Sequence, residues 1–585
     1  MIDMVLVLLF GLSSILGAMH RRLGYYSIMA VSAAFLVNTA LDLTYTGYFS
    51  MIASTVWILV SFFSISYGER YGKWLSSMLA LTIMGMSLIL VSDNYLYLIV
   101  GWEVMSVPSY VIIGLNKSDS RPPFIFMMFS EISTIFIITG AAYAFVVTGT
   151  LAFQSVSSYV PMLLLSVGAL VKMGMSPFMI SEWLPIAHGN APSNASAVLS
   201  STMTLMGVYL IVRMMLISPH QAYVGLFFLI VGAISILFAA MYAYVSENMK
   251  MLAGFSTVDN NAAILAGAGL YLVVSSPTLQ VFILDTILIM SLAHSVAKSG
   301  LFMSIGNTDG EFFSQIRAKS NSLNNIGTFL STMSLSGLLP TIGGLGVWML
   351  LEAFFMEAYT GGFTGIISIV VGSVIALGEG LATGAMLKVL AFGSLFHRPR
   401  EMRHDTGAYA VLATGAVLVA LFAVSTLMVN SAYIGGLPSV AVFNGFTILS
   451  KFTGVDFGLI SPGYIIVLVG IFTVAAYYLF GKPRSRPAPV WNGGRKLNEV
   501  YTSYAYSNNI KLMLSKILRT RVTRSGQHVS IVDVFWAAMT GTGIAYRKMC
   551  RFVTLKIMNS SIGWYMVYMM AAFLGTLLIF AFAYS

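Results

Sequence analysis

Repeated apolar runs of membrane-spanning length constrain this chain more than any other feature. A helix needs roughly 20 apolar residues to cross a bilayer. Only 9% of the residues are charged, against about 25% in ordinary soluble proteins. The runs are continuous rather than alternating, which argues against a β-barrel. The pattern predicts an all-α integral membrane protein with about sixteen transmembrane helices, near residues 3–18, 24–41, 47–66, 76–92, 94–115, 123–148, 158–182, 192–216, 221–244, 250–274, 278–306, 322–358, 363–396, 407–430, 458–480 and 561–583.

Two of these runs are over-long and contain helix-breaking residues. The run 158–182 contains Pro177, and the run 322–358 contains Pro340 followed by three glycines. Proline inside a helix removes a hydrogen bond and clashes with the preceding turn. Broken helices at corresponding places in two halves are typical of inverted-repeat transporters. We therefore expect two inverted five-helix repeats, each with one broken helix.

The sequence changes character after residue 482. A polar, proline-containing linker leads into two segments, 498–519 and 528–556, that mix apolar and basic residues at helical spacing. Such helices lie in the membrane interface or along a neighbouring helix. The segment from Arg495 to Lys556 contains eleven Lys and Arg residues but only two acidic residues. Between membrane spans, this charge indicates anionic lipid headgroups or positive-inside anchoring rather than nucleic acid.

The expected domains follow from these runs. The first run lacks a basic n-region and a cleavage site, so we interpret it as a retained span rather than a signal peptide. The expected location is the cell membrane, crossed many times, and a prokaryotic plasma membrane in particular. The predicted domains are N-terminal transmembrane helices (1–75), a first inverted repeat (76–216), a second inverted repeat (217–400), C-terminal transmembrane helices (401–482), a lateral amphipathic arm (483–560) and a terminal transmembrane anchor (561–585).

The sequence offers no ligands for a redox centre. It contains one cysteine, Cys550, which excludes an internal disulfide and a cysteine-ligated iron–sulfur cluster. Its seven histidines form no pair at axial-ligand spacing within a clear helix. We therefore expect no cofactor and no metal in this chain.

Several ionisable residues lie inside the apolar runs. A charged residue at the centre of a bilayer costs roughly 3 kcal/mol on insertion scales, so such residues are paired or line wet cavities. Glu103, Lys172 and Lys298 are central in their runs, whereas Lys250 lies near the start of its own. His294 and Lys298 are spaced i, i+4 and share one helix face. The simpler interpretation is that each residue forms a structural pair or extends to the interface.

Buried Glu, Lys and His residues together are suited to proton transfer. Histidine titrates near neutral pH, and a nearby carboxylate decides whether a buried lysine keeps its proton. Glu103 and Lys172 form the candidate switch in the first half. The complete set of candidate relay residues is Glu103, Lys172, Lys250, His294, Lys298, Glu352 and Lys388.

Four motifs resemble the antiporter-like subunits of respiratory complex I and its relatives. They are GWEVMSVPSYVIIGL, KMGMSPFMISEWLPIAHGNAPSNASAVLS, ENMKMLAGFSTVDN and LAHSVAKSGLFMSIG, and the resemblance covers about residues 60–400 in consistent order. The resemblance implies that Glu103 and Lys172 form the ion pair of the first half-channel. It also implies that Lys298 is the central lysine, with His294 beside it, and that Lys250 opens its helix.

Three further segments resemble the large membrane subunit of group 4 energy-converting hydrogenases and formate hydrogenlyase. They are LPIAHGNAPS, LKVLAFGSLFHRPR with Lys388, and VWNGGRKLNEVYTSYAYS. This resemblance implies a proton-translocating subunit of an oxidoreductase or translocase complex, without a redox centre of its own. Iron–sulfur clusters, a NiFe centre or a quinone are then expected on partner subunits. The implied partners are other membrane subunits, including further antiporter-like ones, a peripheral redox module and the lipid bilayer.

Two departures from the family pattern keep alternatives open. Ser200 stands where many relatives have histidine, and Val347 stands where they have lysine or glutamate. The nearest carboxylate, Glu352, lies five residues further along the chain and about 140° further round the helix.

One alternative function is a sodium/proton antiporter subunit, which sodium-dependent transport at fixed pH would reveal. Another is a passive scaffold for a redox module, which normal redox activity without pumped charge would reveal. A free-standing solute transporter is disfavoured by the long C-terminal arm.

Overall fold

The structure is a computed structural model of the whole chain. It describes residues 2–40, 44–115, 119–175, 183–218, 221–316, 320–395, 400–402, 404–425, 441–444, 447–452, 455–460, 462–480, 502–513, 521–522, 529–530, 534–557 and 561–583. The chain divides into two compact units, Met1–Asn509 and Ile510–Ser585.

The first unit is a bundle of helices. Its helices are α1 (Ile2–Met19), α2 (Arg21–Ala40), α3 (Tyr45–Tyr67), η1 (Gly68–Arg70), α4 (Lys73–Val91), α5 (Tyr95–Gly114), α6 (Arg121–Thr148), α7 (Tyr159–Lys172), α8 (Trp183–Asn190), α9 (Ser193–Val198), η2 (Leu199–Met203), α10 (Thr204–Ile217), α11 (Ala222–Val245), α12 (Met249–Val273), α13 (Pro277–Gly306), η3 (Phe313–Gln315), α14 (Ser322–Leu335), α15 (Ile342–Thr360), α16 (Gly362–Lys388), η4 (Val389–Leu395), α17 (Thr406–Ala423) and α19 (Pro462–Phe480).

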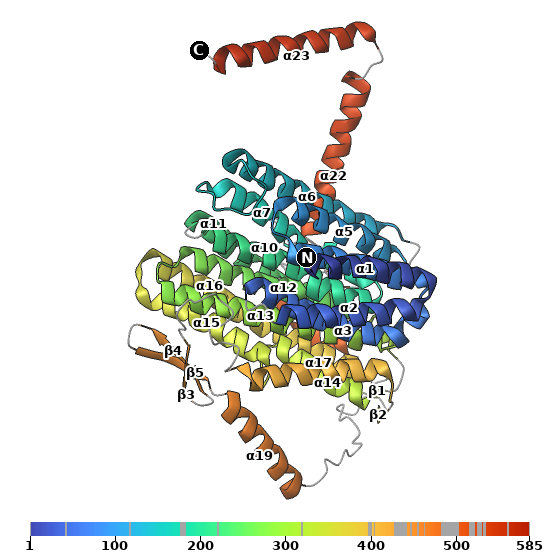
Figure 1. Cartoon of the computed structure of the whole chain (residues 1–585), viewed down its shortest axis with the longest axis vertical. Helices are drawn as coiled ribbons and strands as arrows, with labels where there is room; N and C mark the ends of the chain where they lie inside the picture. The colour runs from blue at the N-terminus through green and yellow to red at the C-terminus, as the bar shows by residue number, and fades with distance from the viewer. Residues whose placement is uncertain are drawn as a thin grey trace. The chain divides into compact units, whose positions relative to one another are not determined.

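Helices α12 and α13 form the centre of this bundle. Figure 1 shows them between α5–α7 on one side and α14–α17 on the other. α12 packs on α8, α10, α11 and α16, whereas α13 packs on α3, α9, α14, α15 and α17. Nearly every residue of both helices is buried, including their ionisable ones. The candidate relay residues of these two helices therefore lie inside the protein rather than facing lipid.

The chain is a multi-pass membrane protein. Among the described residues, twelve helical segments are long and apolar enough to cross a membrane. The predicted number of sixteen is not confirmed. α12 has 25 residues but is not among the twelve, because it carries buried polar residues such as Asp259, Asn260 and Asn261. α7 and α14 have only 14 residues each.

The two predicted interruptions differ in what the structure describes. The run 322–358 is divided into α14 and α15, and Pro340 lies in the connection between them, as predicted. Gly337 in this connection has φ +63°, and Val347 packs directly beside it. α7 ends at Lys172 and α8 begins at Trp183. Pro177 lies outside the described residues.

The remaining elements are short or peripheral. The strands β1 (Ser320–Asn321) and β2 (Arg400–Glu401) pair in parallel. Three antiparallel strands, β3 (Ala441–Asn444), β4 (Thr447–Phe452) and β5 (Val455–Ile460), precede α19. The sequence analysis did not predict them, and α19 accordingly begins at Pro462 rather than near residue 458.

The C-terminal region contains α20 (Ser503–Met513), which begins in the first unit and ends in the second. The second unit also contains β6 (Arg521–Val522), β7 (Val529–Ser530), α22 (Val534–Phe552), η6 (Val553–Ile557) and α23 (Ile562–Ala583). α22 and α23 agree with the predicted amphipathic segment and final apolar span. The linker 481–501 and other parts of the predicted lateral arm lie outside the described residues.

Gly85 marks a close approach between α4 and α5, where a β-carbon would overlap the backbone of Met105. We expect Gly85→Ala to lower the thermal stability of the purified protein in detergent, by about 1–3 kcal/mol, because the helices must move apart. Gly380→Ala is the matched control, because a β-carbon there meets nothing within 4 Å and alanine favours the helix. Equal losses at both positions would contradict this packing.

Candidate functional site

Lys172 is the last residue of α7, and its side chain is 1% exposed. The helix ends here because Gly174 adopts a left-handed conformation with φ +86°, a common way to terminate a helix. A β-carbon at Gly174 would press against Leu184 and Val258. The end of α7 therefore fixes Lys172 inside the bundle, against both α8 and α12.

Hydroxyl groups and aromatic rings surround the Lys172 ammonium group. Its Nζ donates to Ser106 Oγ on α5 at 2.8 Å and to Ser130 Oγ on α6 at 3.0 Å. The same atom lies 5.6 Å from the ring centre of Trp102 and 5.8 Å from that of Phe126. Cation–π contacts of this kind stabilise a desolvated cation. Among the described residues, the direct neighbours of the Lys172 Nζ are therefore hydroxyl groups and aromatic rings rather than a carboxylate.

Glu103 interacts electrostatically with Lys172, and each of the two residues has hydroxyl partners on α5 or α6. Thr134 Oγ1 donates to a carboxylate oxygen of Glu103. Ser106 follows Glu103 by three residues on α5, and Ser130 precedes Thr134 by one turn on α6. The structure thus brings the two predicted residues near each other, with Thr134 bonded to Glu103 and with Ser106 and Ser130 bonded to Lys172.

Glu131 is a further carboxylate beside this pair that the sequence analysis missed. It is half-buried on α6 and interacts electrostatically with Glu103 and Lys172. A carboxylate within the apolar run 123–148 was a detectable signal. What the run alone does not indicate is that this part of α6 faces α5 and the end of α7.

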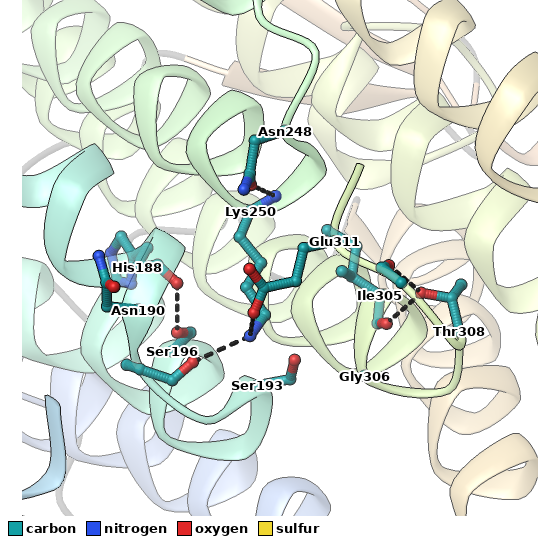
Figure 2. A network of polar contacts seen from close by, with 12 residues as sticks. His188, Asn190, Ser193, Ser196, Asn248, Lys250, Ile305, Gly306, Thr308 and Glu311 are labelled. Carbon is teal, nitrogen blue, oxygen red and sulfur yellow. Dashed lines mark hydrogen bonds and ion pairs between the residues drawn. The ribbon is translucent and has the colours of Figure 1, made fainter. Parts of the chain in front are cut away.

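Lys250 lies at the start of α12, where Asn248 caps the helix by accepting from the Lys250 and Met251 amides. Its Nζ donates to the Ala191 carbonyl at 3.0 Å and forms an ion pair with Glu311 at 3.2 Å. Figure 2 shows Lys250 reaching from α12 toward Glu311, with His188 and Ser196 nearby. Lys250 is 4% exposed, so this predicted residue is buried although it lies at a helix end.

His188 lies between two of the predicted lysines. It is 1% exposed and interacts electrostatically with Lys250 and Lys298. Its ring packs against that of Phe302 at a tilt of 41°, with centroids 4.9 Å apart. Neither ring nitrogen has a hydrogen-bond partner among the described residues. The sequence analysis used His188 only as a family marker, because α8 is too short to show which side it faces.

Lys298 and His294 are buried on α13, as predicted. The Lys298 Nζ donates to the Ala253 carbonyl of α12 at 3.1 Å, and the residue is fully buried. Lys298 also interacts electrostatically with Asp259. His294, one turn earlier, lies beside the backbone of Ser200. Both predicted residues thus face the junction of α12 with η2.

A π-helical turn, η2, forms part of this junction. Ser200 Oγ is 2.6 Å from Thr257 Oγ1 on α12, and Ser295 of α13 donates to the Ser201 carbonyl at 3.0 Å. π-helical turns inside helices are frequent at functional sites. Ser200 therefore contributes a hydroxyl group that bonds across to α12.

Two buried carboxylates lie beyond Lys298. Asp259 on α12 is fully buried, and Glu379 on α16 is 7% exposed. They interact electrostatically with each other. Neither oxygen of Asp259, nor Oε1 of Glu379, has a hydrogen-bond donor within the part of the chain that the structure describes. Neither residue was among the predicted relay residues.

Lys388, at the end of α16, is fully buried and paired with Glu247. Its Nζ lies 2.9 Å from Glu247 Oε1 and also donates to the carbonyls of Tyr244 and Ser246. Ser503 and Ser507 of α20 both donate to the carboxylate of Glu247. This ion pair therefore joins α11, α16 and the first turns of α20.

This ion pair yields a stability prediction. Glu247→Gln is expected to lower thermal stability by about 3–5 kcal/mol, because it leaves the Lys388 ammonium group buried without a counter-charge. The double variant Glu247→Gln/Lys388→Met is expected to recover most of the loss, since both buried charges are then gone. Thermal unfolding of the purified single and double variants measures this. Two additive losses would rule out the coupling.

The last predicted relay residue, Glu352, is half-buried on α15. Its role in proton transfer stays a prediction. Among the described residues, no group of three or more His, Cys, Asp or Glu side chains could hold a metal ion.

The fold of this chain matches that of one chain in a membrane respiratory complex. The membrane-bound sulfane sulfur reductase (MBS), described as an archaeal respiratory membrane complex, contains a chain that superposes with a TM-score of 0.80. The match covers 98% of this chain and 100% of that chain, at 15% identity. At this identity the match shows the fold alone.

Two relatives are similar in sequence. Hydrogenase-4 component B of Escherichia coli (strain K12) is 26% identical over 66% of this chain and 61% of its own length. NADH-quinone oxidoreductase subunit L of Mycobacterium tuberculosis (strain CDC 1551 / Oshkosh) is 27% identical over 67% of this chain and 62% of its own length. The chain thus matches less than two thirds of either relative.

A family comparison covers the helices that hold the lysines. Residues 92–375 match the family described as "NADH:quinone oxidoreductase/Mrp antiporter, TM". This range contains α5–α15, and with them Glu103, Lys172, Lys250 and Lys298. Over residues 92–375, this chain is therefore similar to the NADH:quinone oxidoreductase/Mrp antiporter transmembrane family.

Proposed function

We propose that this chain transfers protons across a membrane as the antiporter-like subunit of a redox-driven complex. The observation that carries the proposal is the burial of Lys172 and Lys298, which are 1% and 0% exposed inside a membrane bundle. Ionisable residues at such positions mark ion pathways and proton relays. Each lysine interacts electrostatically with a carboxylate, Lys172 with Glu103 and Lys298 with Asp259.

The relay runs across the bundle from α5 to α16. In the first half, Glu103 and Lys172 exchange a proton through the hydroxyls of Ser106, Ser130 and Thr134. Lys250, His294 and Lys298 of the second half form the central row together with His188 of the first half. Lys388 and Glu352 are the remaining candidate residues. The first and second inverted repeats are 76–216 and 217–400, and the α7–α8 and α14–α15 connections support this division.

The distribution of basic residues supports a cytoplasmic position for one end of the bundle. The connections 20–22, 68–73, 115–121, 307–321 and 396–405 follow helices that run toward that end, and each contains Lys or Arg. The connection 246–248 at the same end contains Glu247 and no Lys or Arg. The connections 41–44, 92–94, 149–158, 218–221, 274–276 and 361 at the opposite end contain none, and the segment between α17 and α19 contains Lys451. Short cytoplasmic loops carry an excess of Lys and Arg. The basic end therefore faces the cytoplasm of a prokaryotic plasma membrane.

Redox chemistry takes place on partner subunits in this proposal. The similarity to hydrogenase-4 component B, subunit L and the reductase complex supports partners that include membrane subunits and a redox module. Iron–sulfur clusters, a NiFe centre or a quinone would lie on those partners. Moving one charge against 100 mV requires about 2.3 kcal/mol, so the partner reaction must supply this energy.

Proton pumping by the whole complex in sealed vesicles tests the proposal. Electron transfer is expected to acidify one side with a fixed number of protons per electron, with or without sodium at constant pH. A requirement for sodium would instead favour the sodium/proton antiporter, since the matched family includes Mrp antiporters. Normal electron transfer without proton movement would leave only the passive scaffold.

A further inference from the structure

The connection that follows α13 carries a carboxylate, Glu311, whose side chain reaches toward the bundle interior. This side chain is 27% exposed. It lies within the connection 307–321, at the basic end, which faces the cytoplasm in the proposed orientation. Glu311 is therefore a titratable group that contacts water and that the proposed relay does not include.

Backbone contacts hold this connection against the start of α12. The Met249 amide donates to the Glu311 carbonyl at 2.8 Å. Asn248 and Phe312 form an isolated antiparallel bridge between the same two segments. The position of the Glu311 side chain is thus set beside the first turn of α12, where Lys250 lies.

The ion pair of Glu311 with Lys250 lies between water and the bundle interior. Its Oε1 and Nζ atoms are 3.2 Å apart, and the Lys250 side chain is only 5% exposed. Figure 2 shows the two side chains side by side. An ammonium group has three N–H donors, of which one bonds Glu311 and one bonds the Ala191 carbonyl. The third has no partner among the described residues.

The central lysine, Lys298, is close to this ion pair along α12. Its Nζ donates to the Ala253 carbonyl at 3.1 Å. Ala253 follows Lys250 by three residues, which is about 4.5 Å along the helix axis. Lys298 itself lies eight residues before the last residue of α13, about 12 Å from the basic end. Lys250 therefore lies in the interval between Lys298 and the water at that end.

His188 contacts both helices within one turn of each lysine. A β-carbon on Gly254, one turn after Lys250, would lie 3.4 Å from the His188 ring. The ring centroid is 4.9 Å from that of Phe302, which follows Lys298 by one turn. Neither His188 nitrogen has a hydrogen-bond partner within the described ranges. Buried polar atoms of this kind are usually bonded to ordered water, so His188 is placed to exchange protons with both lysines.

We propose that Glu311 takes up protons from the cytoplasm and loads them onto Lys250 for transfer through His188 to Lys298. This inference rests on the proposed function and adds the point of proton uptake. In each cycle, the Lys250 ammonium group gives a proton to the neutral His188 ring and becomes a neutral amine. The Glu311 carboxylate takes a proton from water and passes it to that amine, which restores the ion pair. His188 then protonates a neutral Lys298 and becomes neutral again, so the protons balance.

Glu311→Gln in the whole complex tests this assignment. Inverted membrane vesicles expose the cytoplasmic side to the medium, so an external buffer reaches residue 311. We expect the rate of proton pumping to fall by about tenfold or more, because a positioned proton-transfer group is lost. The membrane-impermeant buffer MES, at rising external concentration, is expected to restore most of the rate, because it replaces Glu311 as the proton donor at the surface. Glu69→Gln is the matched control, because Glu69 is 47% exposed and forms a surface ion pair with Arg22 at the same end.

A double variant keeps the test decisive if Lys250 without its counter-charge prevents assembly. Glu311→Gln/Lys250→Gln removes both charges, so the complex is expected to assemble but to pump slowly with or without MES, since Lys250 is also lost. Normal pumping in either variant overturns the inference. A loss in Glu311→Gln that MES leaves unchanged also overturns it, because a structural ion pair then explains the loss. Failure of the proposed function differs, because the native complex itself would then pump no protons.

Discussion

Lys172→Met is expected to abolish proton pumping by the assembled complex, with a loss of about a hundredfold or more in protons moved per electron. Methionine nearly matches lysine in length but carries no proton, so the hydroxyls of Ser106 and Ser130 lose the group to which they pass it. Positioned proton-transfer groups typically contribute a factor of about 10²–10⁴ in rate. The measurement is vesicle acidification recorded with electron transfer on the same sample.

Lys73→Met is the matched control for this variant. Lys73 opens α4, is exposed and lies 5.8 Å from the ring centre of Trp74, outside the bundle interior. It tests whether losing any lysine reduces pumping through membrane insertion or net charge. Unchanged pumping per electron in Lys172→Met would show that the buried lysine is structural, and the passive scaffold would then be preferred.

A second variant distinguishes proton transfer through the hydroxyls near Lys172 from an effect of charge alone. Thr134→Val keeps the shape of the side chain but removes the hydroxyl that donates to Glu103. If the hydroxyls between Glu103 and Lys172 carry the proton, pumping falls although both charged residues remain. If the two residues act only through charge, pumping in Thr134→Val stays normal.

Hydropathy was sufficient to predict the bundle but not its exact number of spans. The apolar run 250–274 corresponds closely to α12, even though α12 is too polar to count as a span by hydropathy alone. Pro340 correctly predicted the division of the run 322–358, because proline disrupts a helix wherever the helix packs. The strands β3–β5 were missed, because their sequence has no clear alternation of polar and apolar residues.

The buried lysines were predictable, whereas their surroundings were not. Lys172 and Lys298 stand out in the sequence because charge inside an apolar run is costly. Glu131, His188 and Glu379 become candidates only once packing shows which residues lie beside those lysines. From spacing alone, the sequence predicts which residues share a face of one helix, as with His294 and Lys298. It does not indicate which residues of different helices face each other.

α14 shows why tertiary structure was needed to describe the second half of the bundle. In the sequence, SLNNIGTFLSTMSL appears as a weakly apolar segment before a break. Only burial separates its lipid-facing Ile326 and Phe329 from its inward polar residues. Similarly, Val347 in place of lysine or glutamate kept alternatives such as the passive scaffold open in the sequence analysis. The structure instead provides buried carboxylates on α12 and α16, which the search for a replacement near Val347 did not consider.

Lys298→Arg is expected to abolish pumping as completely as Lys298→Met, although arginine keeps the positive charge. Lys298 is fully buried, with one protein hydrogen bond to Ala253 and an electrostatic interaction with Asp259. A relay residue must release its proton in each cycle. A buried lysine can do so, whereas an arginine does not deprotonate in proteins. Both variants are therefore expected to lose about a hundredfold or more of the pumping rate.

The contrast between the two substitutions decides what Lys298 does. If it only supplied a fixed positive charge opposite Asp259, Lys298→Arg would retain pumping and Lys298→Met would lose it. Assembly of each variant is checked by co-purification of the partner subunits, and electron transfer is recorded together with acidification. In a tightly coupled complex, Lys298→Arg is expected to stop electron transfer together with proton pumping. In a loosely coupled complex, electron transfer is expected to continue without pumped protons. Sustained pumping in Lys298→Arg would contradict a relay in which Lys298 itself releases a proton, because arginine keeps its proton in proteins.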